Sequence, residues 1–316
     1  MVLSSVLIIT GLAVLVYGAN LLVKGAVEVA EKYGISEIIV GLTIVAFGTS
    51  TPELVVNIIS AIGGQSEINL GNIVGANIHN IALVLGIAGF LNPLAVDKKI
   101  ISRDTPFAIF ASVVFILAGL SSSQISRIDA VIFLACFSYF MYYLIKHALG
   151  DYRDFKTSNE KATATVPLSK SIFHIISGIF LLWLGGEITV TNSVSFAKCL
   201  GIPVSLIAIV VISNGTSLPE LVASIIAWKR KNSGIALGNI LGSNIFNILF
   251  ILGVSGLIRP LKIYGWFFID SLLMLLFTLL FMGVIFFKKE KILAKKEGVF
   301  FFTCYFVYLV YVILRR

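Results

Sequence analysis

The octapeptides GTSTPELV, at residues 48–55, and GTSLPELV, at residues 215–222, are nearly the same sequence at positions 167 residues apart. With the same offset and no gap, GNIVGANIHNI at 71–81 aligns with GNILGSNIFNI at 238–248. Over residues 17–86, more than a third of the positions are identical to their counterparts. This extent of identity exceeds what shared apolar composition would produce, and it predicts an internal repeat.

The chain as a whole is too apolar for a soluble protein. Of its 316 residues, 58% are hydrophobic and 13% are charged, whereas a soluble domain has about 25% charged residues. A membrane helix needs roughly 20 apolar residues, and ten such segments lie at about 2–23, 36–62, 69–91, 106–122, 127–147, 169–195, 203–228, 236–258, 264–287 and 297–314. We therefore expect an all-α membrane protein with ten transmembrane helices, the first of which is not a cleaved leader.

A polar stretch at 149–168 divides the predicted helices into a first repeat, 1–148, and a second repeat, 169–316. Because each repeat has five helices, the second enters the membrane from the opposite side, so the repeats are inverted. Counted on alternate joints, Lys and Arg number 18 on one side and 6 on the other. Positive residues favour the cytoplasm, which predicts a plasma-membrane protein with both termini outside and a cytoplasmic linker. The net charge of +8 serves this orientation, and we expect no nucleic-acid partner.

Each repeat has one glutamate in its second helix, Glu53 in the first and Glu220 in the second. An ionised carboxylate inside the bilayer costs several kcal/mol unless it is paired, solvated or protonated. No Lys or Arg lies nearby in the sequence at the same depth. Because the costly residue occurs at equivalent positions, a functional site is favoured over two protonated side chains that only link helices.

A proline precedes each glutamate. Pro52 has no N–H for the carbonyl of Gly48, so we expect the helix to bend or open around Gly48 and Thr49. Pro219 has the same effect on the turn of Gly215 and Thr216. The threonine and the glutamate are four residues apart in both repeats, so carbonyl and carboxylate oxygens can face one cavity.

The third helix of each repeat adds side-chain amides, which are Asn72, Asn77, Asn80, Asn239, Asn244 and Asn247. We expect Asn80 and Asn247 to lie nearest the ion because they are deepest in their apolar runs, and Asn77 and Asn244 to support them. An all-oxygen site with two carboxylates suits a hard divalent cation such as calcium. His79, whose counterpart is Phe246, is expected to pack or to handle protons rather than to bind metal.

The two copies of GTSxPE and GNIxGxNIxN resemble the alpha-repeats of the calcium/cation antiporter superfamily, over essentially the whole chain. The resemblance implies a small prokaryotic exchanger that moves Ca²⁺ against H⁺ or Na⁺ by alternating access, as a sufficient monomer without a cofactor or protein partner. It implies Ca²⁺ ligands at Glu53, Glu220 and the main-chain oxygens of Thr49 and Thr216. The further positions implied for coupling ions are Ala46, Ser50, Ala76, Ser213, Ser217 and Ser243.

Three positions depart from the sodium-coupled pattern of that superfamily. Ala76 replaces a serine, Asn247 stands where some relatives have Asp, and Asn214 replaces an apolar residue before GTS. With two carboxylates, one divalent ion or two protons leave the site neutral, whereas three sodium ions leave it at +1. We therefore predict Ca²⁺/H⁺ exchange, with Na⁺/Ca²⁺ exchange as the alternative.

The expected mechanism follows from this charge balance. Two carboxylates in a low-dielectric site repel each other, so the site takes up either Ca²⁺ or protons, and an empty charged site resists the change of access. The first and sixth helices are expected to slide, because Gly18, Gly25, Gly178, Gly185 and Gly186 line them.

Two other classes of protein are less favoured. A cation channel can use the same oxygens, and it is the more remote alternative. An intramembrane enzyme is not expected, because the chain has neither HExxH nor GxSxG, and His79, His147 and His174 have no repeated or motif-bound setting. The sequence leaves the roles of His79 and Glu187 open.

Overall fold

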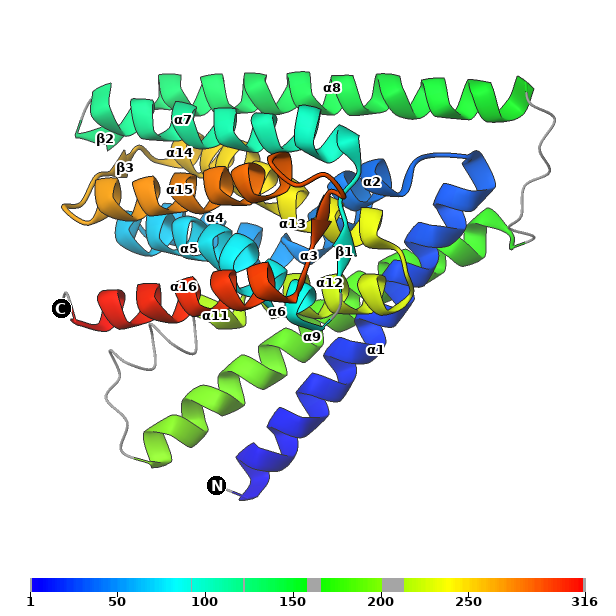
Figure 1. The fold of residues 1–316 in the computed structure, drawn as a ribbon. Coiled ribbons are helices and arrows are strands. Elements are labelled where there is room, and N and C mark those ends of the chain that lie inside the picture. Colours follow the sequence, from blue (N-terminus) through cyan, green and yellow to red (C-terminus); the bar gives the residue numbers. More distant parts are fainter. Residues whose placement is uncertain (1, 92, 122, 158–165, 201–212, 315–316) are drawn as a thin grey trace.

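The computed structural model describes residues 2–91, 93–121, 123–157, 166–200 and 213–314. Apart from two pairs of very short strands, the secondary-structure elements in this part of the chain are helices (Figure 1). Eight helices in the described part are long and apolar enough to cross a membrane, or nine if one bent pair is counted as a span. The predicted helix at 203–228 lies partly in 201–212, outside the described residues. The chain is therefore an all-helical, multi-pass membrane protein.

The first half begins with α1 (Val2–Tyr33) and ends with α8 (Arg127–Thr157). Between them lie α2 (Glu37–Val40), η1 (Gly41–Val45), α3 (Ala46–Thr49), α4 (Thr51–Ile62), α5 (Ser66–Ile78), η2 (His79–Val84), α6 (Leu85–Leu91), η3 (Ile100–Asp104) and α7 (Thr105–Ser121). The segments labelled η are π-helical turns inside longer helices. η1 and η2 lie within predicted spans, and η3 lies just before the predicted span 106–122.

The second half follows the same order. It contains α9 (Leu168–Cys199), α11 (Ser213–Gly215), α12 (Leu218–Lys229), α13 (Ser233–Ile245), η5 (Phe246–Ile251), α14 (Leu252–Ile258), α15 (Phe267–Phe286) and α16 (Lys295–Leu314). The helix formed by α13, η5 and α14, like its counterpart at 66–91, is the most buried of the candidate spans. These two helices therefore form the centre of the molecule.

Two antiparallel strand pairs join the halves. The strands are β1 (Leu94–Ala95), which pairs with β4 (Ile292–Leu293), and β2 (Gln124–Ile125), which pairs with β3 (Leu261–Lys262). Leu94 lies opposite Leu293, and Ile125 lies opposite Leu261. The two pairings are equivalent under the repeat if β1 corresponds to β3 with an offset of 167 residues and β2 corresponds to β4 with an offset of 168 residues.

The close contacts of two glycines show the same two offsets, 167 and 168, between the halves. A Cβ on Gly253 would lie 3.3 Å from the carbonyl of Ala130, and a Cβ on Gly86 would lie 3.2 Å from that of Gly298. Gly86 and Gly253 are 167 residues apart, whereas Ala130 and Gly298 are 168 apart. The last helix of each half thus packs against the third helix of the other half.

α1 and α9 run side by side at a steep angle to the other helices (Figure 1). A Cβ on Gly178 would lie 2.5 Å from the backbone nitrogen of Leu22, and one on Gly185 would lie 2.6 Å from that of Leu15. Gly18 and Gly25 also face the backbone of α9, whereas nothing lies within 4 Å of a Cβ on Gly186. Most of the glycines singled out in the sequence therefore permit close backbone contact. Glu187 of α9 is exposed and accepts a hydrogen bond from Thr191.

α8 is longer than its apolar segment, since it runs to Thr157 and covers part of the predicted linker. Contacts with the end of α1 explain the extension. The Asp151 carboxylate accepts a hydrogen bond of 3.2 Å from the Ser36 N–H, and the rings of Tyr33 and Tyr152 pack edge to face at 5.9 Å. Residues 158–165 of the linker lie outside the described residues.

Candidate functional site

A break divides the second helix of each half. α3 and α4 meet at an angle of 49°, on either side of Ser50, whose φ is −83° and ψ is 10°. Ser217 has nearly the same backbone angles, −90° and 7°, between α11 and α12. Pro52 and Pro219 lie in the first turns after these breaks, where a missing N–H is tolerated. The break predicted around Gly48 and Thr49 is thus found one residue later.

Glu53 and Glu220 lie in the first turns of α4 and α12 and are fully buried. The Ser50 hydroxyl donates to Glu220 Oε1 over 2.9 Å, and the Ser217 hydroxyl donates to Glu53 Oε1 over 3.2 Å. Each serine therefore holds the carboxylate of the other repeat. The N-terminal end of a helix also favours a negative charge. This exchange of partners brings the two carboxylates to one place at the centre of the molecule.

The threonines before these serines also bond across the repeats. Thr49 Oγ1 donates to Asn239 Oδ1 over 3.0 Å, and Thr216 Oγ1 donates to Asn72 Oδ1 over 3.2 Å. The Asn239 amide in turn donates to the main-chain oxygen of Glu220 over 3.3 Å. Side-chain bonds to the central helices therefore fix the backbone at each break.

Four asparagines link the two central helices in a symmetric pattern. The amides of Asn77 and Asn244 each donate to the backbone carbonyl of the other residue over 3.2 Å. The Asn80 amide donates to Asn244 Oδ1, and the Asn247 amide donates to Asn77 Oδ1, each over 3.0 Å. Because the NH₂ groups are engaged, the side-chain oxygens of Asn80 and Asn247 stay available as acceptors.

Four oxygens of this cluster are buried and have no hydrogen-bond donor among the described residues. They are Glu53 Oε2, Glu220 Oε2, Asn80 Oδ1 and Asn247 Oδ1. A buried acceptor without a partner costs about 1–3 kcal/mol, and more if it is charged. A bound cation would remove this cost, and carboxylate and amide oxygens are what a hard cation such as Ca²⁺ prefers.

The other positions predicted to bind or support ions differ in what they add to the site. Ser243 Oγ lies 3.5 Å from Thr49 Oγ1, and Ala76 is buried but offers no side-chain oxygen. The side chain of Ser213 lies outside the described part of the structure, and Ala46 accepts from Thr49 through its carbonyl. His79 precedes Asn80 in the chain, is buried, and has no hydrogen-bond partner for its Nδ1 among the described residues.

Sequence reasoning missed the π-helical turns η2 and η5, which begin at His79 and Phe246 and contain Asn80 and Asn247. Such turns are frequent at functional sites, because they displace side chains and widen the backbone ladder. The residue types in η2 and η5 do not distinguish these turns from ordinary helix. Their equivalent positions in the two repeats were therefore the only signal available from the sequence.

Comparison with known proteins identifies the family of this chain. The family model described as "Sodium/calcium exchanger protein" matches residues 3–146 and 170–314. The chain belongs to the sodium/calcium exchanger family. It is 35% identical to the candidate antiporter CaxA of Alkalimonas amylolytica over 263 residues, 82% of each chain, and 32% identical to the sodium/calcium exchanger MaX1 of Methanosarcina acetivorans, over 81% of this chain and 83% of MaX1.

A solved member of the sodium/calcium exchanger family has the same fold. The structure of the sodium-calcium exchanger NCX_Mj superposes with a TM-score of 0.82 at 28% identity and covers 98% of both chains. The two matched segments correspond to the two repeats. The protein is therefore a cation transporter of this family rather than an enzyme, and the resemblance inferred from the paired motifs is confirmed.

Proposed function

We propose that this protein is a secondary antiporter that exchanges Ca²⁺ for H⁺ by alternating access at Glu53 and Glu220. The observation that carries the proposal is the symmetric set of four buried acceptor oxygens, two from the carboxylates and two from the amides of Asn80 and Asn247. Main-chain oxygens of Thr49 and Thr216 at the helix breaks complete the proposed ligand set. The site combines oxygen ligands only, as expected for Ca²⁺.

Charge balance supports protons as the counter-ion. The cluster has two carboxylates, so one Ca²⁺ or two protons neutralise it. Ala76 removes one oxygen that a sodium ion would use, and Asn247 provides an amide where some sodium-coupled relatives have a third carboxylate. Both changes reduce the capacity of the site for several monovalent cations.

Na⁺/Ca²⁺ exchange is the second candidate, because MaX1 and NCX_Mj are both named as sodium/calcium exchangers. Ser50 and Ser217 keep hydroxyl oxygens beside the carboxylates, and Ser243 keeps one beside Thr49 Oγ1, so oxygens that could bind sodium are present in part. The two candidates share the same Ca²⁺ ligands and differ in the ion that replaces Ca²⁺.

The proposed topology has ten membrane helices in two inverted repeats, with both termini outside and the linker in the cytoplasm. The strand pairs support it, since β1 and β4 lie in two joints of the Lys-rich side, and β2 and β3 lie in two joints of the other side. α1 and α9 are the proposed moving layer, because glycines let them pass each other with backbones in contact.

Transport in reconstituted vesicles tests the proposal. Ca²⁺ uptake is measured under a pH gradient and, separately, under a Na⁺ gradient, for the wild type and for Glu53→Gln and Glu220→Gln. We expect uptake driven by the pH gradient and lost in both variants, whereas Glu67→Gln, the same change at an exposed residue of α5, keeps it. Uptake driven only by Na⁺ would select the second candidate.

A third outcome of the same assay would contradict both candidates. Ca²⁺ flux that needs no counter-cation, at a rate far above that of a transporter, would indicate a channel. The two carboxylates would then form a selectivity filter rather than an exchange site.

A further inference from the structure

The two long helices α1 and α9 are counterparts in the repeat, but they pack differently on the core. α1 packs along α12, whereas α9 has much less contact with α4, the counterpart of α12. α12 ends at Lys229, on the Lys-rich side, and α4 ends at Ile62, on the opposite side. The two halves thus have different conformations, with α1 covering the core on the predicted cytoplasmic side and α9 standing off it on the predicted outer side.

A hydrogen bond joins α1 to the core on the cytoplasmic side. The guanidinium of Arg230, just after α12, donates to Asn20 Oδ1 of α1 over 3.0 Å. The Asn20 amide in turn donates to the carbonyl of Val16 in its own helix over 2.9 Å, which directs its oxygen toward Arg230. The bond therefore ties the layer of α1 and α9 to the core at the place where α1 covers α12.

The repeat offset of 167 gives the residues at the equivalent place on the outer side. Glu187 of α9 is the counterpart of Asn20, and Gly63, just after α4, is the counterpart of Arg230. Glu187 is exposed, and its carboxylate accepts a hydrogen bond of 3.2 Å from Thr191 in its own helix. Within the described residues, it has no ion pair with the core.

A positive charge stands at this place on the outer side, although Gly63 has no side chain. Arg259 follows α14, and its guanidinium lies against Gly64, where an added Cβ would be 3.0 Å from Arg259 Cζ. Gly64 has φ of +71°, a conformation that glycine adopts readily. Arg259 is exposed, and no carboxylate pairs with it in the described part of the chain.

We propose that Glu187 forms an ion pair with Arg259 when the outer side closes, at the place equivalent to the bond between Asn20 and Arg230. The inference rests on alternating access in the proposed function. Because inverted repeats are related by an axis in the membrane plane, exchanging the conformations of the two halves reverses the side that is open. α9 then packs along α4 as α1 packs along α12 here, which brings Glu187 to the turn at Gly63.

The charges of this pair favour closure of the outer side. Glu187 and Arg259 carry opposite charges, and their attraction becomes stronger as water leaves the closing side. In the present conformation both side chains are exposed, so neither charge is buried without a partner. The pair therefore stabilises the closed outer side and adds no cost to the open one.

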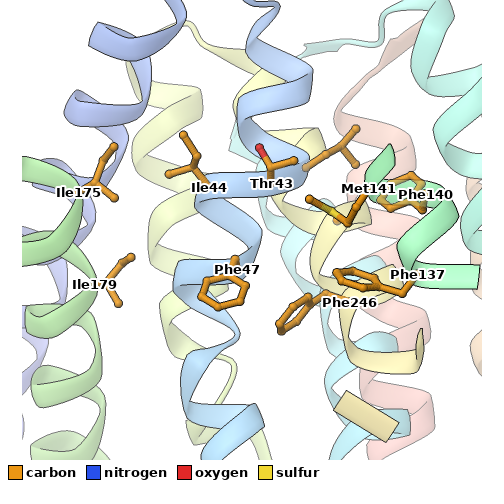
Figure 2. Close-up of a pocket in the computed structure, with 11 residues that line it drawn as sticks. Thr43, Ile44, Phe47, Phe137, Phe140, Met141, Ile175, Ile179 and Phe246 are labelled. Carbon is orange, nitrogen blue, oxygen red and sulfur yellow. The ribbon is translucent and has the colours of Figure 1, made fainter. Parts of the chain in front are cut away.

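The layer of α1 and α9 also has room to move. A cavity of about 360 Å³ lies between Ile175 and Ile179 of α9 and Phe137 and Met141 of α8, with Phe47 of α3 in its wall (Figure 2). In a close-packed interior, a shift of one helix displaces the side chains around it. Because the cavity separates α9 from α8, α9 can change its position there without displacing the side chains of α8.

Exchange of the two charges tests the pair. Glu187→Arg, Arg259→Glu and the double variant are compared with the wild type in exchange of labelled for unlabelled Ca²⁺ across vesicles at equal pH. This assay needs both access states but no gradient of H⁺ or Na⁺. Arg127→Glu is the matched control, because Arg127 is exposed, lies on the same predicted side and donates to the carbonyl of Leu257 over 3.3 Å.

We expect each single variant to slow Ca²⁺/Ca²⁺ exchange by about five-fold, as loss of an exposed ion pair does. The double variant should restore the rate to within about two-fold of the wild type, and the control should keep it. No slowing in the single variants, or equal slowing in the double variant, overturns the pair and leaves the exchanger intact. A wild type without Ca²⁺/Ca²⁺ exchange overturns alternating access, and the pair with it.

A cross-link measures the approach of α9 to α4 independently of charge. The background is a variant in which the cysteines are replaced by alanine, at Cys136, Cys199 and Cys304. Glu187→Cys is combined with Gly63→Cys, where a Cβ has ordinary contacts at 3.4 Å, and Asn20→Cys with Arg230→Cys is the positive control. We expect a bifunctional reagent about as long as an arginine side chain to link both pairs and each link to stop Ca²⁺/Ca²⁺ exchange. Linking of the control pair alone overturns the proposal.

Discussion

Removing the serine hydroxyl that holds one carboxylate in place should weaken Ca²⁺ binding. Ser50 donates to Glu220 over 2.9 Å and Ser217 donates to Glu53 over 3.2 Å, both fully buried. A hydrogen bond to a charged group contributes about 1.5–3 kcal/mol, and 1.4 kcal/mol corresponds to a factor of ten in affinity. Ser50→Ala and Ser217→Ala are each expected to raise the half-saturating Ca²⁺ concentration about ten-fold, with the larger effect for Ser50→Ala because its bond is shorter.

The assay is Ca²⁺-dependent uptake into vesicles, measured over a range of Ca²⁺ concentrations at fixed driving gradient. Ser112→Ala is the control, because this buried hydroxyl bonds only to the carbonyl of Ala108 in its own helix, over 2.9 Å. Its half-saturating concentration should change by less than about two-fold. The reasoning fails if Ser112→Ala weakens Ca²⁺ binding as much as the two site variants, or if neither site variant weakens it.

Three further substitutions test the packing around the site. Gly178→Ala should slow transport and lower the melting temperature in detergent, because overpacking costs about 1–3 kcal/mol, whereas Gly186→Ala, which has open space, should leave both unchanged. Asn77→Ala removes hydrogen bonds between the central helices, each of about 0.6–2 kcal/mol, and a melting curve should show the loss. Arg103→Gln leaves the buried Asp104 without its ion pair, so thermal unfolding should show a loss of about 3–5 kcal/mol, and an unchanged melting temperature would contradict this pairing.

The repeat made much of the fold predictable from the sequence. Two copies of a motif with Gly, Pro and Glu at fixed spacing specify two broken helices, and equal positions in the repeats imply that Glu53 and Glu220 meet near a pseudo-twofold axis. The structure places both carboxylates in bonding distance of serines from the opposite repeat. The local sequence could not indicate which serine donates a hydrogen bond to which glutamate, because that pairing depends on how the two halves pack against each other.

The limits of the helices were less predictable. The polar residues at the end of α8 have no apolar pattern, and they are helical because Tyr152 contacts Tyr33 at the end of α1 and Asp151 accepts a hydrogen bond from Ser36 before α2. Gly34, with φ of +60°, ends α1 beside Phe155, which an apolar segment alone does not show. Tertiary contacts thus extended both helices beyond the hydrophobic signal.

The residues that contact His79 also could not be predicted from the sequence. Tyr305 lies on the last helix and Asn214 on the seventh predicted one, so no spacing along the chain connects them with His79. The correspondence of Tyr305 with Phe137 becomes visible only after the second offset, 168, is known, and the strand register supplies it.

The packing of each half against the other affects how the polypeptide can assemble. α16 packs on α6 and α8 packs on α14, and both strand pairs join residues from different halves. Neither half can complete its hydrophobic interior alone. Two polypeptides separated between Thr157 and Val166 should therefore be degraded when produced singly but should associate into an active transporter when produced in the same cell.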